Sequence, residues 1–271
     1  MIPMTIQTRV QTPITQEHID FYRENGFVQV DNMIAPDELA ELREFLEEAM
    51  QNDGDRSVST DKKGGLYYRV LNQKVSVWRD HAGMGRYTTH PRFAEAARLL
   101  TGASGIRLFH DHGLWKMPGD SKATPWHQDT PYWPVNEANP GMMSLWLTLD
   151  DVDERNGCMA FVPKSNQLGK LKGIDLTDPQ NIFDYIEGGQ ADAQKPVVVP
   201  LKAGSCTFHD GLTFHYAHAN STDKPRRVLA IIFMPDGVTY SGDPHVITDG
   251  TGLEKGQPIA GPRFPLLARK G

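Results

Sequence analysis

The densest group of polar and aromatic side chains lies at 124–134 and reads Thr-Pro-Trp-His-Gln-Asp-Thr-Pro-Tyr-Trp-Pro. It contains His127 and Asp129, which are separated by one residue. On extended backbone the side chains of residues i and i+2 point to the same face, so both can reach one metal ion. One imidazole and one carboxylate are two of the three ligands of the facial triad that holds non-haem Fe(II) for oxygen chemistry. The pair therefore predicts a metal site.

The chain holds a second His-x-Asp pair, His18 and Asp20, which lies in a different setting. Its segment, 16–25, has the pattern of a helix, in which residues i and i+2 point about 200° apart. We interpret His18 and Asp20 as part of a solvated helix face. The spacing alone therefore does not define a metal site, and a third ligand is needed.

The third ligand is expected from a histidine on a later strand. Three histidines are candidates: His209, His215 and His218. Arg226 follows them at the start of the apolar run 228–234. An arginine at the mouth of a strand can hold a carboxylate through two parallel hydrogen bonds, which an iron site with a keto-acid cosubstrate requires. The alternative is that Arg226 and Arg227 are ordinary surface charges.

Five motifs occur in a fixed order along the chain. The first three are a helix followed by a Gly-hydrophobic-Val strand at 21–30, a Lys-x-Pro-Gly-like turn at 115–119, and Trp-His-x-Asp at 126–129. The fourth comes after Trp146 and consists of Asn-Gly-Cys and Pro-x-Ser at 156–165. The fifth is His215, followed by Asn220 and by Pro-Arg-Arg at 225–227. Together, over roughly residues 15–235, they resemble the phytanoyl-CoA dioxygenase (PhyH) family of Fe(II)- and 2-oxoglutarate-dependent oxygenases.

The resemblance implies a ligand set and a cosubstrate site. His215 lies eleven residues before Arg226, as the family's distal iron ligand does, so the implied ligands are His127, Asp129 and His215, with His218 as the alternative. The implied cofactors are Fe(II), 2-oxoglutarate and O2, with Arg226 anchoring the far carboxylate of 2-oxoglutarate. The family often has a hydroxyl residue two positions after the distal histidine. Here that residue is Ala217, and the usual Pro-Gly-Ser-His is Pro-Lys-Ser-Asn at 163–166.

The segment 107–116 alternates in a way that places His110, His112, Leu114 and Lys116 on one face of a strand. In relatives the matching face lines the pocket beside iron. We expect His110, Tyr132 and Trp133 to contact substrate, and His112 and Trp146 to lie beside 2-oxoglutarate. The alternatives are a structural role, with the three aromatics in the core, or a His-x-His metal pair as in cupins, although the glutamate that usually follows such a pair is missing.

Helices and short strands must position these residues. Helices are predicted over 16–25, about 37–50 and about 91–100, and strands over 107–116, 143–149, 159–162, 197–201, 205–208 and 228–234. Strands without regular βαβ alternation favour an antiparallel sandwich or barrel. With the resemblance, we predict a mainly β fold with flanking α: a double-stranded β-helix (jelly roll, cupin-like) with N-terminal helices packed outside. Residues 1–271 form one domain, with a core at about 15–235, a candidate lid loop at 167–195 and an irregular C-terminal tail at 236–271.

Composition limits the partners. Lys and Arg number 28 against 34 Asp and Glu, a net charge of −6 without a basic block, which argues against nucleic acid. The longest apolar run, 228–234, is far shorter than the roughly 20 residues of a membrane helix, and the N-terminus lacks a signal peptide's apolar core. The two cysteines, Cys158 and Cys206, have no CxxC spacing and fit a reducing compartment. We expect a cytoplasmic protein with a small-molecule substrate; the sequence does not define its oligomeric state.

The expected reaction is oxidation, above all hydroxylation, of a C–H bond, with release of succinate and CO2. Related halogenases have Gly or Ala where this chain has Asp129, so halogenation is not expected. No basic cluster fits a CoA tail, which favours a small metabolite or natural-product intermediate as substrate. Two alternatives remain at this stage: a zinc-dependent hydrolase on the same ligands, in which Arg226 has no role, and a non-catalytic jelly-roll binding module.

Overall fold

Two antiparallel sheets form the centre of the molecule, for which the computed structural model describes residues 10–52, 58–59, 72–118, 121–136, 141–176, 182–185 and 195–271. The large sheet runs in the order β1 (Phe27–Val30), β9 (Cys206–Asp210), β6 (Met143–Thr148), β11 (Arg226–Pro235), β4 (Gly105–Lys116), β3 (Asn72–Val75) and β2 (Val58–Ser59), with β12 (Leu266–Arg269) paired to β4. The small sheet runs in the order β5 (Thr124–His127), β10 (His215–Ala217), β7 (Met159–Phe161) and β8 (Val197–Val199). The predicted mainly β, jelly-roll fold is confirmed.

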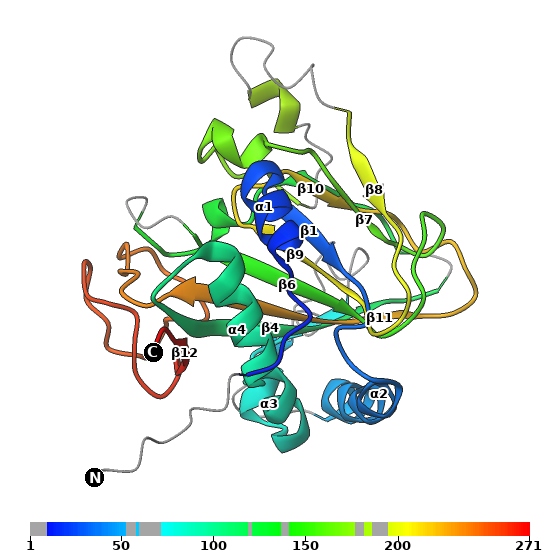
Figure 1. Cartoon of the computed structure of the whole chain (residues 1–271), viewed down its shortest axis with the longest axis horizontal. Helices are drawn as coiled ribbons and strands as arrows, with labels where there is room; N and C mark the ends of the chain where they lie inside the picture. Colours follow the sequence, from blue (N-terminus) through cyan, green and yellow to red (C-terminus); the bar gives the residue numbers. More distant parts are fainter. Residues whose placement is uncertain are drawn as a thin grey trace.

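The α-helices pack against the large sheet. They are α1 (Gln16–Asn25), α2 (Pro36–Gln51), α3 (Ala82–Thr88) and α4 (Pro91–Thr101). Shorter 3₁₀ turns are η3 (Val77–Arg79), η4 (Thr130–Tyr132), η5 (Ser165–Leu168) and η6 (Ile182–Tyr185). In Figure 1, α2 and α3 lie below the large sheet, and β7, β8 and β10 of the small sheet lie above it. None of the helices that the structure describes is long and apolar enough to cross a bilayer.

Three helices match the sequence prediction because their ends carry local signals. The Thr15 hydroxyl accepts from the His18 amide at the start of α1, and Gly26 ends that helix with φ 79°. The helix α3 was not predicted, because its two glycines weaken the helical pattern. A Cβ at Gly83 would lie 2.6 Å from the Phe45 ring, so glycine lets α3 approach α2.

Strand alternation decides which residues face the interior between the sheets. On β11, Leu229, Ile231 and Phe233 pack in the core cluster beneath the helices. Arg226 and every second residue after it face the opposite side, which is the side of the cavity and the inner face of the sheet. On the neighbouring strand β4, the residues paired with this inner face are Lys116, Leu114, His112 and His110. The predicted inner face of the 107–116 strand is therefore confirmed.

The segment after β11 is mostly turns and isolated bridges, but it ends in a strand. β12 pairs with the first residues of β4, so the predicted irregular tail 236–271 is anchored to the edge of the large sheet. Residues of this segment also form a buried cluster with Phe109 and Trp133: Val238, Ile247, Ile259 and Phe264. The predicted lid loop 167–195 lies partly outside the described residues.

Candidate active site

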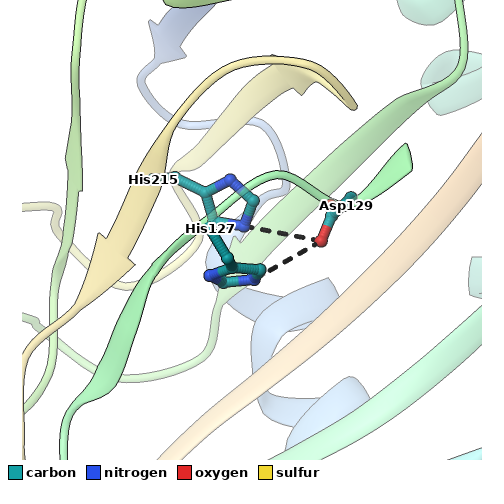
Figure 2. Close-up of side chains that lie close together, drawn as sticks. All are labelled: His127, Asp129 and His215. Atoms are coloured by element: carbon teal, nitrogen blue, oxygen red, sulfur yellow. Dashed lines mark ion pairs between the residues drawn. The ribbon is translucent and has the colours of Figure 1, made fainter. Parts of the chain in front are cut away.

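Three side chains from separate parts of the chain meet at one point between the sheets. His127 ends β5 and His215 begins β10, and the two residues are paired across the small sheet. The Oδ1 atom of Asp129 lies 3.6 Å from His127 Nε2 and 3.5 Å from His215 Nε2 (Figure 2). One ligand atom from each residue lies within 4.8 Å of the others. Two imidazoles and a carboxylate at this separation fit a single Fe(II) ion and leave coordination positions open.

Both histidines are oriented by their second ring nitrogen. His127 Nδ1 lies 2.7 Å from the carbonyl oxygen of Pro125, and His215 Nδ1 lies 2.9 Å from that of Thr213. A carbonyl only accepts, so Nδ1 carries the proton in each ring and the Nε2 lone pair is left for a metal. Burial, followed by the nearby His215, lowers the pKa of His127, which favours the neutral ring that a metal requires.

Asp129 reaches the site from a turn and not from extended backbone. β5 ends at His127, and Asp129 has φ −79° and ψ −41° at the start of η4, so the expectation that alternation aligns the pair was wrong. The turn is set instead by the amide of Asp129, which donates to the Gly211 carbonyl at 2.9 Å. A Cβ at Gly211 would lie 2.5 Å from Thr130 Oγ1, so only glycine permits this approach.

The second carboxylate oxygen of Asp129 is held from the large sheet. Ser144 Oγ on β6 donates to Oδ2 at 2.9 Å, and His209 Nε2 on β9 lies 3.3 Å from the same atom. Burial alone would raise the pKa of Asp129, but the surrounding histidines, His215 first, outweigh it and hold the pKa well below its usual value. The group is therefore a carboxylate with one oxygen directed at the two histidines.

The three candidate histidines have different positions. His215 lies in the triad, and His209 lies behind Asp129. His218 points away, with its Nδ1 3.1 Å from the carbonyl oxygen of Cys158. Ser144 and His209 were not predicted to hold Asp129, because the signal is a cross-strand register between β6 and β9 and not a local motif.

Arg226 is buried with unpaired donors. The residue is 1% exposed, and its guanidinium carbon lies 5.1 Å from the Trp146 ring centre. Within the described part of the chain, its Nε and Nη1 have no hydrogen-bond partner. Burial lowers the pKa of Arg226 to about 9. Unpaired buried donors are costly, and a carboxylate satisfies two of them at once, so this side chain fits the far carboxylate of 2-oxoglutarate. The alternative role suggested by the sequence, an ordinary charge near the surface, fits Arg227 instead. Its Nη2 lies 2.7 Å from Asp150 Oδ1.

A cavity of about 460 Å³ joins the triad to Arg226. It is lined by every site residue that the sequence suggested: His110, His112, His127, Asp129, Tyr132, Trp133, Trp146, His215 and Arg226. Lining residues that were not predicted include Val75, Thr124, Ser144, His209, His245 and Val246.

Tyr132 and Trp133 each have a structural contact beside the cavity. The Tyr132 hydroxyl donates to the Ile174 carbonyl at 2.7 Å, which ties the described part of the 167–195 segment to the cavity wall. Trp133 is buried and lies edge-on to Phe109, with ring centres 6.4 Å apart. Each of the two rings therefore makes a contact within the protein interior and also lines the cavity.

Comparison with known proteins identifies the class. The family model described as phytanoyl-CoA dioxygenase (PhyH) matches residues 22–228. The peroxisomal phytanoyl-CoA dioxygenase of Bos taurus is 23% identical over 246 residues, 86% of this chain and 72% of that protein. The methylphosphonate hydroxylase of Gimesia maris is 24% identical over 230 residues, 83% of this chain and 82% of that protein.

Solved structures agree with the family model. The non-heme alpha ketoglutarate dependent epimerase SnoN from nogalamycin biosynthesis is 32% identical, with a TM-score of 0.78 over 93% of this chain and 98% of that chain. The carbocyclase SnoK from the same biosynthesis is 26% identical, with a TM-score of 0.78 over 94% of this chain and 97% of that chain. SnoN has also been crystallised with Fe³⁺, alpha ketoglutarate and nogalamycin RO.

The chain belongs to the phytanoyl-CoA dioxygenase family. It is an Fe(II)- and 2-oxoglutarate-dependent dioxygenase, as predicted, and the zinc hydrolase and the non-catalytic binding module are not favoured. Bound Fe(II), with 2-oxoglutarate and O2, supplies the oxidation of a substrate C–H bond coupled to conversion of 2-oxoglutarate to succinate and CO2. The protein supplies the group of His127, Asp129 and His215, a buried guanidinium at Arg226 and the cavity between them.

Proposed function

We propose that this dioxygenase oxidises, most simply by hydroxylation, a C–H bond of an uncharged natural-product intermediate. His127, Asp129 and His215 hold the iron, and Arg226 holds the far carboxylate of 2-oxoglutarate. The observation that carries the proposal is that the triad and an unpaired, buried guanidinium open into the same cavity of about 460 Å³. A hydrolytic zinc site has no use for that guanidinium.

The carboxylate of Asp129 also bears on the type of reaction. Because Asp129 fills the third ligand position and is fixed by Ser144 and His209, no position is vacated for a halide. This supports oxidation over halogenation. The neighbours SnoN and SnoK are described as an epimerase and a carbocyclase, so epimerisation and ring closure, besides desaturation, are the alternatives to hydroxylation.

Thr124 is proposed to replace the hydroxyl that is missing at Ala217. The two residues are paired across β5 and β10, and both line the cavity together with Arg226. A threonine hydroxyl can donate to a carboxylate oxygen. Lys116 supports this end of the site from behind, since its ammonium donates to the carbonyls of Ala217 at 3.1 Å and His218 at 2.6 Å.

The substrate is proposed to be uncharged because the cavity offers little to an anion. Among the described residues that line it, Arg226 is the only lysine or arginine. If 2-oxoglutarate occupies Arg226, no cation remains in that wall for a phosphate or a CoA tail. The nogalamycin enzymes SnoK and SnoN support a natural-product intermediate over an acyl-CoA ester.

An anaerobic titration tests the site. Fe(II) followed by 2-oxoglutarate should produce a visible charge-transfer band in the wild-type protein, which a zinc site would not give. His215→Ala should lose the band. His218→Ala is the matched control from the same strand region and should keep it, because His218 points away from the triad. A band that survives His215→Ala and disappears in His218→Ala would reverse the ligand assignment.

A second experiment tests the substrate class. Succinate release is measured with a panel of uncharged polycyclic and glycosylated compounds and with a panel of acyl-CoA esters. We expect release above the uncoupled background with members of the first panel. Turnover confined to the acyl-CoA esters would contradict the proposal while leaving the iron and 2-oxoglutarate assignment in place.

A further inference from the structure

Three histidines outside the triad line the cavity, of which His110 is buried and His112 and His245 are half-buried. His110 and His112 lie on the inner face of β4, and His245 lies in the segment after β11. The ring centres of His110 and His112 are 4.6 Å apart, and those of His110 and His245 are 6.3 Å apart. We call His110, His112 and His245 the histidine wall.

The histidine wall has unsatisfied polar atoms. His110 is 2% exposed, and among the residues that the structure describes neither of its ring nitrogens has a hydrogen-bond partner, nor does His112 Nδ1. His245 Nδ1 accepts from the Ile247 amide at 3.2 Å, so its Nε2 is left to donate. Buried polar groups in native proteins are nearly always paired, so a set of unpaired nitrogens beside a cavity indicates a ligand that completes them.

His245 is held in place by the C-terminal segment. Phe109 stacks on His245 with ring centres 6.0 Å apart, and on Phe264 with ring centres 5.9 Å apart. Phe264 in turn packs with residues on both sides of His245, and β12 anchors the end of the segment to β4. The family model ends at residue 228, before this part of the cavity wall.

The surroundings favour the neutral form of the three imidazoles. Burial is the first cause in each case: it lowers the pKa of His112 to about 4, that of His110 well below the usual value, and that of His245 in the same direction. Around them the wall is apolar, with Val75, Trp133 and Ile232. Neutral imidazoles each offer one donor and one acceptor, which suit hydroxyl and carbonyl groups better than ions.

We propose that the histidine wall recognises hydroxyl or carbonyl oxygens on an otherwise apolar, uncharged substrate, and that His245 is a specificity-determining residue of this chain. The inference rests on the proposed function for the location of the substrate and deepens it by naming the chemistry of recognition. The wall is not proposed as a second metal site, because in the described part of the chain the compact group of possible ligands is His127, Asp129 and His215.

The test compares two probes that differ only in hydroxyl groups, 2,7-dihydroxynaphthalene and naphthalene. Binding is measured by fluorescence titration in the protein loaded anaerobically with Fe(II) and 2-oxoglutarate. The wild type should bind the dihydroxy compound at least about tenfold more tightly, and His110→Phe or His245→Phe should each reduce that preference about five- to tenfold. Naphthalene should bind these variants as well as, or better than, the wild type.

Two variants serve as controls. Val246→Ala changes the apolar neighbour of His245 at the cavity wall and should leave the preference unchanged. His245→Gln keeps a donor and an acceptor and should retain most of the preference. His245→Leu, which removes both, replaces His245→Phe if that variant does not fold. If the wild type and both Phe variants showed the same preference for the dihydroxy compound, the proposed role of the histidine wall would be wrong.

The class of ligand and the underlying function have separate readouts. If 2-naphthoate binds more tightly than 2,7-dihydroxynaphthalene, the wall recognises anions and the neutral class is wrong. The 2-oxoglutarate charge-transfer band, recorded in the same samples, reports on the proposed function. Its absence with a normal hydroxyl preference would reject the cosubstrate assignment alone, and its presence with no hydroxyl preference would reject the histidine wall alone.

Discussion

The inner face of β11 and β4 carries two kinds of unpaired polar group, and they differ in charge. Arg226, opposite Lys116, is a buried cation. Six residues further along β11, about 20 Å of extended strand, Ile232 lies opposite His110, and there the unpaired groups are neutral imidazoles. The end of this face at Arg226, the arginine end, suits a dianion of fixed structure. The end at His110, the histidine end, suits an uncharged molecule.

The difference indicates how one scaffold can keep its cosubstrate and change its substrate. The arginine end is built from two long paired strands, whose register fixes Arg226 against Lys116. The histidine end adds His245 from turns that pack on Phe109 and Phe264. Turns tolerate sequence change better than central strands, so we expect position 245 to vary in related enzymes more than position 226 does.

Removing the triad carboxylate should have the largest effect and should leave both ends of the cavity intact. Asp129→Ala deletes a ligand, so Fe(II) affinity should fall by more than the 10–100-fold typical for loss of an outer partner. His209→Phe removes one support of that carboxylate, so the Fe(II) affinity of this variant should fall by about 10–100-fold. Both affinities are measured anaerobically by calorimetry. An Asp129→Ala protein with the lesser defect of the two would contradict the ligand assignment.

Changing the arginine end should affect 2-oxoglutarate and not the substrate probes. Arg226→Leu leaves no cation for the far carboxylate, and the loss of such a pair costs about 2–5 kcal/mol, or roughly 30–4000-fold in the 2-oxoglutarate Kd. The cofactor-free variant should be at least as stable as the wild type, because an unpaired buried charge has been removed. Calorimetry and thermal denaturation measure the two effects.

Arg227→Leu is the matched control for the arginine end. Arg227 is its neighbour in sequence but pairs with Asp150 near the surface, so this change should leave the 2-oxoglutarate Kd within about twofold. Equal losses in the two variants would show that a general change of charge, and not the cavity position of Arg226, governs cosubstrate binding.

A smaller effect is expected from the hydroxyl that assists Arg226. Thr124→Val keeps the shape of the side chain and removes one donor, so the 2-oxoglutarate Kd should rise about three- to tenfold. Ala217→Ser in the Thr124→Val background should recover most of that loss, because the two residues are paired across β5 and β10. Recovery is measured as the midpoint of the charge-transfer titration. No loss in Thr124→Val would remove Thr124 from the cosubstrate site.

The parts of the molecule that the sequence predicts are those with local signals. The caps at Thr15 and Gly26 define α1, and alternation over 107–116 places His110 and His112 on the inner face. The metal group followed from the ordered motifs, and the structure brings His127, Asp129 and His215 together. In each case the deciding residues are neighbours in sequence or members of one motif.

What the sequence did not predict depends on contacts between distant segments. Asp129 meets the histidines through a turn whose shape depends on Gly211, more than eighty residues away. Ser144 and His209 reach the same carboxylate through the pairing of β6 with β9. His245 follows a stretch of glycine and proline that carries no periodic pattern, so only the packing on Phe109 reveals its place in the cavity wall.

The smallest functional effect is expected behind the histidine wall, at Asp111. This residue lies between His110 and His112 but points to the other face of β4, where its Oδ2 accepts from the Trp78 amide at 3.1 Å and Thr88 Oγ1 at 2.7 Å. Burial raises the pKa of Asp111 to about 7, far above its value in an unfolded chain. Between pH 4 and pH 7 the folded protein therefore binds a proton that the unfolded chain releases, and this contribution to stability is lost as the pH rises.

Asp111→Asn should remove that pH dependence of the unfolding free energy without changing the histidine wall. The amide oxygen can accept both hydrogen bonds and does not ionise, so from pH 4 to pH 7 the variant should gain more than about 1 kcal/mol in unfolding free energy relative to the wild type. Urea denaturation across this range measures the difference. The hydroxyl preference of the Asn variant at pH 7 should equal that of the wild type. If the preference changed with Asp111→Asn, the two faces of β4 would be coupled, and recognition could no longer be assigned to the inner imidazoles alone.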